Sequence, residues 1–229
     1  MIGALINAAT VLAGGAAGLT LKSKLPERAQ RVGLQVLGVV TLVLGVKMTV
    51  GTRNVFVVVT ALAAGMASGS LLRIQQRLEH AAQWLQQRIV SRRESSGIAE
   101  GFITASLLFC VGPMTIVGSI QDGLIGDYKL IAIKSAMDGI AAMAFATGLG
   151  WGVLLSAATV LVVQGGITLG ANSLIGCFTE PLVAEMSAVG GVLVVCIGIG
   201  LLGLKKLPVA DYLPAIFFAP LLARLFQRL

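Results

Sequence analysis

The segment Val111–Asp127 reads VGPMTIVGSIQDGLIGD. It continues an apolar run long enough to cross a membrane, yet it holds Gly112, Pro113, Gly118 and Gly123 where a plain membrane helix would carry Leu or Val. Proline removes a backbone donor, and glycine loosens a helix. Within hydrocarbon, freed backbone groups are tolerated only where protein or a water-filled cavity satisfies them. The segment therefore predicts a discontinuous membrane helix with a functional site at the break.

The composition of the whole chain predicts the same environment. The chain has 229 residues, of which 56% are hydrophobic and only 12% are charged. A soluble domain carries about a quarter charged residues. Several apolar runs approach the length of about twenty residues that spans a bilayer as a helix. These runs are continuous rather than alternating, which argues against a closed barrel. The predicted fold class is an all-α, polytopic membrane helical bundle.

The net charge of +7 does not indicate a nucleic-acid partner. Lys and Arg residues lie in short loops between apolar runs, which is the bias that orients membrane helices. The chain has no basic surface interleaved with aromatic residues. The expected partner is the lipid bilayer. The basic loop 22–31 is expected to face the cytoplasm, and the loop 170–181, which has no Lys or Arg, is expected to face outward.

The apolar runs divide the chain into expected helices. The first, Met1–Leu21, lacks a basic leader and a clear cleavage site, so we take it as a spanning helix rather than a signal peptide. Segment 73–96 has apolar residues at helical spacing and a basic excess, which predicts an amphipathic helix on the cytoplasmic face. Segment 97–150 provides linking helices, with the broken segment 111–127 as two half-helices or a re-entrant piece. The expected helices are 2–21, 32–50, 55–72, a fourth that begins near Gly97 and enters the broken segment, 130–147, 152–169, 186–204 and 212–226, the last broken by Pro214 and Pro220.

Two parts of the chain resemble each other. GALINAATVL (3–12) matches GVLLSAATVL (152–161), GLTL (18–21) matches GITL (166–169), and LGVK (44–47) matches LGLK (202–205). We predict a duplication, with repeat one at about 2–72 and repeat two at about 151–226. The first expected helix corresponds to the sixth, and this odd offset inverts the second repeat relative to the first. Inverted repeats with discontinuous helices are the architecture of many secondary transporters, and they also occur in channels.

Polar residues near the predicted break are the candidate binding groups. Lys134 and Asp138 are four residues apart, so they share a helix face and can pair. A charge at this depth is costly unless it is paired or faces a cavity. The alternatives are that this pair only fixes helix packing, and that Asp122 only caps a helix end. The full set for substrate or ion binding is Asn7, Thr115, Ser119, Gln121, Asp122, Lys134, Asp138 and Ser156, with Gly112, Pro113, Gly118 and Gly123 as the helix break.

Enzymatic function is not expected. The chain has no HExxH, no GxSxG and no Walker loop. Its three cysteines, Cys110, Cys177 and Cys196, are far apart and form no metal-ligand pattern, so neither a metal nor a cofactor is predicted. The predicted function is a transporter or channel for a small solute or ion, and the alternative is a non-transport membrane sensor or scaffold. A homo-oligomer is compatible with either function.

Three stretches resemble a known family. They are GALINAATVLAGG (3–15), SKLPERAQ (23–30) and above all FCVGPMTIVGSIQDGL (109–124). With these motifs the chain resembles the YqgA/YdfK-like proteins, a family of bacterial inner-membrane proteins of unknown function. The resemblance implies a multi-pass protein of the bacterial cytoplasmic membrane and brings no activity. The stretch after the third helix is often more acidic in such proteins, whereas here it holds Ser70, Arg73, Gln75 and Gln76. No role for acids is expected there.

Overall fold

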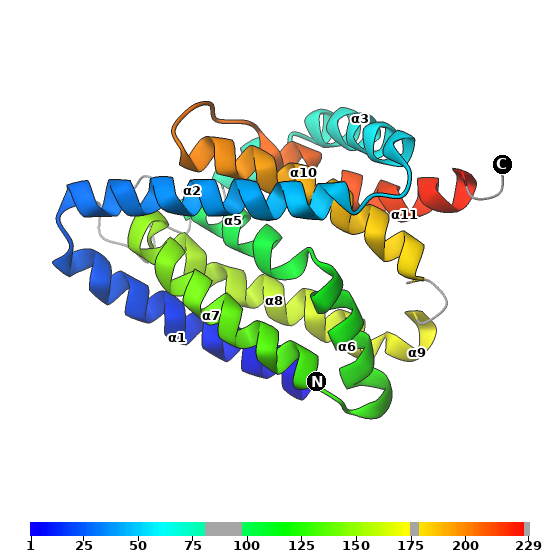
Figure 1. The fold of residues 1–229 in the computed structure, drawn as a ribbon, viewed down its shortest axis with the longest axis horizontal. Coiled ribbons are helices and arrows are strands. Elements are labelled where there is room, and N and C mark those ends of the chain that lie inside the picture. The colour runs from blue at the N-terminus through cyan, green and yellow to red at the C-terminus, as the bar shows by residue number, and fades with distance from the viewer. Residues whose placement is uncertain (81–97, 175–178, 227–229) are drawn as a thin grey trace. The chain divides into compact units, whose positions relative to one another are not determined.

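A computed structural model describes residues 1–80, 98–174 and 179–226, and in these ranges the regular secondary structure is helical (Figure 1). The helices are α1 (Ile2–Lys24), α2 (Glu27–Val50), α3 (Val55–Leu72), α5 (Ile98–Cys110), α6 (Pro113–Ile125), α7 (Lys129–Leu149), α8 (Gly152–Leu169), α9 (Ala171–Leu174), α10 (Glu180–Leu201), the 3-10 turn η1 (Val209–Tyr212) and α11 (Ala215–Phe226). The all-α fold class is confirmed.

The chain forms two compact units. Unit 1 contains Met1–Leu37 and Ser91–Phe178, and unit 2 contains Gly38–Val90 and Thr179–Leu229. Helix α2 begins in the first unit and continues in the second. The units do not coincide with the predicted repeats, because each unit combines part of repeat one with part of repeat two.

In unit 1, α1 packs against α7 and α8. The contact with α7 is close because α1 carries glycine there: a methyl group on Gly14 would overlap the backbone carbonyl of Gly139. Gly3 lies against Ile131 and Gly18 against Met143, so α1 and α7 run in the same direction. Small residues allow this close approach of two membrane helices.

Helix α8 runs opposite to α1. A Cβ atom on Gly15 of α1 would lie 2.7 Å from a methyl carbon of Leu154, near the start of α8. A Cβ atom on Gly165, near the end of α8, would lie 4.0 Å from the Met1 sulfur. The start of α1 is therefore beside the end of α8.

The predicted helix break is present as a bend of 61° between α5 and α6. Ile98, at the start of α5, lies against Gly152 at the start of α8, and Gly123 of α6 lies against Thr168 near the end of α8. The two ends of the bent pair thus lie at opposite ends of α8. This geometry favours two half-helices that cross together over a re-entrant piece.

In unit 2, α10 is packed along α2, and α11 along α3. Gly45 of α2 contacts Gly191 of α10, while Gly38 contacts Leu202, so these two helices are antiparallel. Helices α3 and α11 are antiparallel too, because Gly65 contacts Ala215 and Gly69 contacts Asp211.

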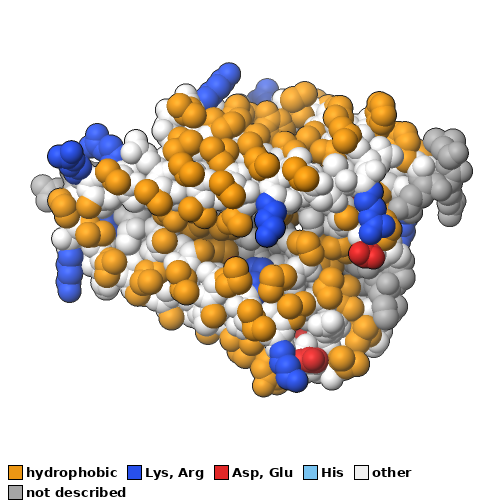
Figure 2. All heavy atoms as spheres, in the orientation of Figure 1, with side chains coloured by type: hydrophobic (Ala, Val, Ile, Leu, Met, Phe, Trp, Pro, Cys, Tyr) orange, Lys and Arg blue, Asp and Glu red, His pale blue; other side chains and the backbone are white. Residues whose placement is uncertain are grey.

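Seven of the described helices are long and apolar enough to cross a membrane, and there are eight such spans if the bent pair α5–α6 counts as one. Their outer faces carry large hydrophobic side chains that none of the described residues covers. On α2 these include Val36, Val39, Val43 and Val50, of which Val50 is 76% exposed. Figure 2 shows hydrophobic side chains over most of the visible surface, with Lys and Arg as isolated groups. Such surfaces suit contact with lipid.

Several expected boundaries were wrong, and helix α2 begins at Glu27, five residues before the expected start. Helix α10 begins at Glu180, six residues before the expected start, because the carboxylate of Glu185 is buried rather than placed in a loop. It accepts hydrogen bonds from the backbone N–H groups of Arg53 (2.7 Å) and Asn54 (3.0 Å). Pro220 lies inside α11 and does not break it. Of the predicted amphipathic helix 73–96, residues 74–80 are helical and residues 81–96 lie outside the described part of the chain.

Candidate functional site

Helix α7 carries an ion pair in the interior of unit 1. Lys134 and Asp138 are each only 7% exposed, and the Lys134 ammonium group bonds to Asp138 Oδ2. Their spacing places both side chains on one face of α7, as the sequence predicts. Each buried side chain therefore has its counter-charge on the same helix, inside the bundle.

The same ammonium group also donates a hydrogen bond at the helix break. In an unbroken helix, the carbonyl of Phe109 would accept from the N–H of residue 113, but Pro113 has no N–H. Lys134 Nζ donates to the Phe109 carbonyl at 2.8 Å, and Thr115 Oγ1 donates to it at 3.0 Å. Two side chains thus replace the lost backbone donor, as burial in an apolar environment requires.

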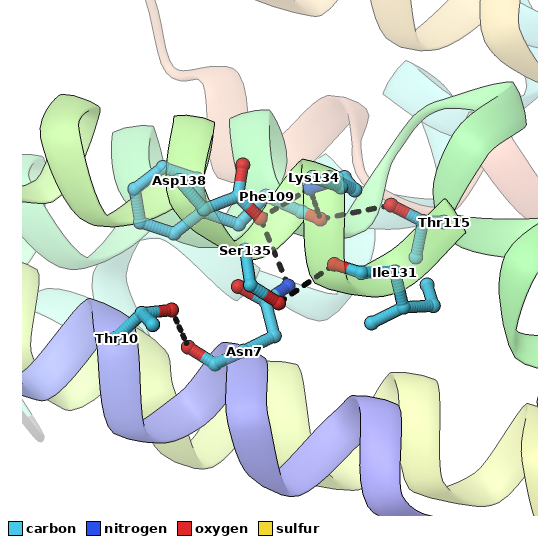
Figure 3. A network of polar contacts seen from close by, with 8 residues as sticks. All are labelled: Asn7, Thr10, Phe109, Thr115, Ile131, Lys134, Ser135 and Asp138. Atoms are coloured by element: carbon cyan, nitrogen blue, oxygen red, sulfur yellow. Dashed lines mark hydrogen bonds and ion pairs between the residues drawn. The ribbon is translucent and has the colours of Figure 1, made fainter. Parts of the chain in front are cut away.

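Asn7 joins this group from α1. Its side chain is fully buried, and Nδ2 donates to Asp138 Oδ2 at 2.9 Å. Figure 3 shows how Asn7, Asp138, Lys134, Thr115 and the Phe109 carbonyl connect α1, α7 and both halves of the bent pair. We call these five residues the break network. Asn7 Oδ1 has no hydrogen-bond partner within the described chain.

Other buried polar atoms in unit 1 also lack a partner within the described residues. They are Ser119 Oγ on α6, and on α8 Thr168 Oγ1 and both polar atoms of the Gln164 amide. Gln164 is 0% exposed and Ser119 is 1% exposed. Ser119 was predicted from the sequence and Gln164 was not, although an amide stands out within the apolar run VLVVQGG (160–166).

Asp122 lies apart from the break network, at the start of α1. Its Oδ2 accepts from the N–H of Gly3 at 3.1 Å and lies 2.8 Å from the backbone nitrogen of Met1. An acid in this position satisfies free N–H groups and interacts well with the helix dipole. The geometry matches the capping alternative for this residue.

Two further predicted residues do not join the break network. Gln121 is exposed on α6. Ser156 is buried on α8, but its hydroxyl donates to the Val153 carbonyl of its own helix at 2.6 Å. Sequence equivalence with Asn7 therefore does not give Ser156 an equivalent set of partners.

The residues of the predicted break have distinct positions. Gly112 is the N-cap of α6 in an extended conformation, and Pro113 occupies the first turn, where a missing N–H is harmless. Gly118 lies against Ile131, and Gly123 lies so close to the Thr168 carbonyl that a methyl group would overlap it. These glycines permit α6 to approach α7 and α8 closely.

No group of three or more His, Cys, Asp or Glu side chains suited to a metal ion occurs within the described residues. Cys110 is buried and Cys196 is half-buried, while Cys177 lies outside the described residues. What this interior offers chemically is hydrogen bonding and one neutralised pair of charges.

Comparison with known proteins identifies the family. Residues 2–224 match DUF554, described as "Protein of unknown function". The chain belongs to this family. It is 27% identical over 224 residues to the uncharacterised membrane protein YdfK of Bacillus subtilis, which covers 96% of this chain and 94% of that protein. It is 30% identical over 222 residues to the uncharacterised protein YqgA of Escherichia coli, with the same coverage of 96% and 94%.

These matches confirm the resemblance drawn from the three sequence motifs. No solved structure matches this DUF554 chain. Together with its apolar helices, the match to a protein named for its membrane location identifies the chain as an integral membrane protein. The family description assigns no activity, so function has to be argued from the break network.

Proposed function

We propose that this protein is a transporter or channel for a small solute or ion in the bacterial inner membrane, with its pathway at the α5–α6 bend. The observation that carries the proposal is the buried Lys134–Asp138 pair, bonded both to Asn7 and to the carbonyl that Pro113 frees. An ionisable residue within a membrane span is a functional-site hypothesis by default.

Stability alone does not account for this pair. Replacing a buried ion pair by apolar residues of similar volume is often neutral or stabilising, since both charges lose their hydration on burial. Helix packing between α1 and α7 is already provided by close glycine contacts at Gly14 and Gly18. A role beyond packing therefore explains the pair better.

The network links an ionisable group to a bend in the backbone. Asp138 is the group that would take up a proton or a cation, and Lys134 connects it to the Phe109 carbonyl at the end of α5. Neutralising Asp138 would release Lys134 from the ion pair and so change its hydrogen bond to the Phe109 carbonyl at the bend. Ion binding and the angle between α5 and α6 would then be coupled, as alternating access requires.

The directions of the helices support the predicted inverted repeat. The sequence pairs α1 with α8 and α2 with α10, and both pairs are antiparallel in the structure. Helices α3 and α11, which follow in the same order, are antiparallel as well. A binding site near the meeting point of such repeats is the common transporter arrangement.

Flux through the purified protein in liposomes tests the proposal. Proton entry is followed with a trapped pH-sensitive dye under a potassium diffusion potential, and entry of urea, glycerol and small amino acids is followed by osmotic swelling. We expect flux above that of empty liposomes for at least one of these. Lys134→Met/Asp138→Leu should remain folded and lose that flux, whereas Lys129→Gln, which changes an exposed lysine on the same helix, should keep it.

Retention of full flux by the double variant would overturn the proposed site. The alternative of a non-transport sensor or scaffold predicts no flux from the wild-type protein in any arm. The proposal is of a non-enzymatic role, so no cofactor enters the assay.

A further inference from the structure

We propose that Ser119, Gln164, Thr168 and the free oxygen of Asn7 form a hydrated site in unit 1, which binds small neutral molecules able both to donate and to accept hydrogen bonds. The site would lead from the end of α8 to the break network. This inference rests on the proposed function and extends it, because it names a path and the chemical class of its occupant.

The first observation is that these polar atoms are buried and unpartnered. Within the described chain, none of the four side chains has a hydrogen-bond partner at the atom in question, and the exposed fractions run from 0% for Asn7 and Gln164 to 6% for Thr168. Buried polar groups almost always have a partner in protein or ordered water. Leaving them without one is costly in an apolar environment, so an occupant is expected.

The second observation is the register of the helices. Ser106 of α5 bonds to Thr159 of α8 at 3.1 Å, and Gly123 of α6 contacts Thr168. The bent pair therefore ascends α8 in the same direction. Ser119 lies one turn before Gly123, so it shares the face of α6 that contacts α8, and Gln164 lies one turn before Thr168 on α8.

The register of α1 places Asn7 deeper along the same path. Met1 is beside Gly165, and Gly15 is beside Leu154, so α1 descends α8 from its end toward its start. Thr168 and Gln164 thus come first from the end of α8, and Asn7 follows. Asn7 Nδ2 is already bonded to Asp138, which leaves Oδ1 as the contact between this path and the break network.

The chemistry of the site selects a neutral occupant. Gln164 presents one donor group and one acceptor, and the two hydroxyls can act as either. The nearby charges are already engaged: Asp122 by the start of α1, and Lys134 and Asp138 by each other. Water fits this description, since a buried water needs two to four polar partners. Small neutral solutes such as urea or glycerol have the same hydrogen-bonding character.

Cysteine reactivity tests whether the site is wet. In a background of Cys110→Ala, Cys177→Ala and Cys196→Ala, Ser119→Cys is compared with Ser135→Cys in proteoliposomes. Both serines are 1% exposed, but Ser135 donates to the Ile131 carbonyl at 2.7 Å, whereas Ser119 is unpartnered. We expect a small water-soluble methanethiosulfonate to modify Cys at position 119 about tenfold faster or more, because thiolate chemistry needs water. Equal rates at the two positions would overturn the hydrated site.

Flux through Gln164→Leu identifies the occupant. This variant removes both unpartnered atoms while keeping the side-chain volume similar, so we expect it to fold with an unchanged or higher Tm. Stopped-flow light scattering then measures water flux under a sucrose gradient, and swelling measures urea and glycerol entry. A loss of water flux alone identifies a water path, and a loss of urea or glycerol entry identifies a solute site. Val162→Leu on the exposed face of α8 is the control.

The two proposals fail in different ways. If Lys134→Met/Asp138→Leu abolishes flux while Gln164→Leu retains all wild-type fluxes, the proposed path past Gln164 is wrong and the proposed function stands. If the wild-type protein shows no flux at all but Ser119→Cys still reacts faster than Ser135→Cys, the site is hydrated and the transport function is wrong.

Discussion

At the scale of single residues, the contacts inside unit 1 centre on one backbone N–H group that is absent at Pro113. Pro113 cannot donate to the Phe109 carbonyl, and Lys134 and Thr115 donate instead. Lys134 needs a counter-charge at this depth, which Asp138 provides from the next turn of the same helix. Lys134 thus satisfies the buried carbonyl, and Asp138 in turn neutralises the buried charge of Lys134.

The energetic consequence is a prediction about Lys134. Lys134→Met leaves Asp138 as an uncompensated buried carboxylate, which should lower the free energy of unfolding by about 3 kcal/mol or more. Adding Asp138→Leu removes that charge and should restore most of the stability. Thermal unfolding in detergent, with Tm read for the wild type, both single variants and the double variant, checks this. A double variant no more stable than Lys134→Met would contradict the coupling of the two residues.

Sequence reasoning predicted the Lys134–Asp138 pair because it depends only on spacing along one helix. It did not predict that Lys134 also holds the Phe109 carbonyl, since this contact depends on how α5 and α7 pack. For Asp122 two roles were left open, substrate binding and the capping of a helix end, and the structure places this acid at the start of α1. Gln164 was not predicted, because a single amide in an apolar run carries no charge and breaks no helix.

At the scale of elements, acidic side chains join one helix to the start of another. Asp122 of α6 accepts from Gly3 in α1, and Glu185 of α10 accepts from Arg53 and Asn54 just before α3. Asp211 in η1 accepts from the N–H of Gln75 at 2.9 Å. The first N–H groups of a helix have no partner in their own helix. These acids supply one from elsewhere in the fold.

Asp122 should therefore matter for stability rather than for flux. Asp122→Ala removes the acceptor at the start of α1 and should lower the free energy of unfolding by about 1 kcal/mol. The loss of a helix cap costs at most about 2 kcal/mol. Asp122→Asn retains an oxygen acceptor and should cost less. Tm values in detergent, together with flux per folded protein in liposomes, check this. Loss of flux in a stably folded Asp122→Asn protein would contradict the structural role.

Close packing of α1 on α7 gives a second prediction at this scale. A methyl group on Gly14 would overlap the Gly139 carbonyl, so Gly14→Ala should force the helices apart and cost about 1–3 kcal/mol. Gly166 of α8 has nothing within 4 Å of the added atom, so Gly166→Ala should leave Tm unchanged or raise it slightly. The yield of monodisperse protein on size-exclusion chromatography and the Tm report both effects. Equal behaviour of the two variants would contradict the packing.

At the scale of the whole molecule, the sequence predicted the number and type of spans well. The helices 55–72 and 152–169 match α3 and α8 residue for residue. Length and apolar character decide where a membrane helix lies, and both can be read locally. The start of α10 was misplaced because charged residues there were taken for a loop, and the crossing of α5–α6 was left open because it depends on contacts with α8.

The crossing of the bent pair leads to a prediction of membrane topology. Within unit 1, α7 runs parallel to α1, while α8 and the bent pair run the opposite way. The basic loop 22–31 and the turn at Gly150 are then on one side, and the turn at Asp127 and residue Asn172 on the other. Since basic loops favour the cytoplasm, reporter fusions after residues 24 and 150 should be cytoplasmic. Fusions after residues 127 and 172 should be on the outer side, and a cytoplasmic signal after residue 127 would contradict a full crossing by α5–α6.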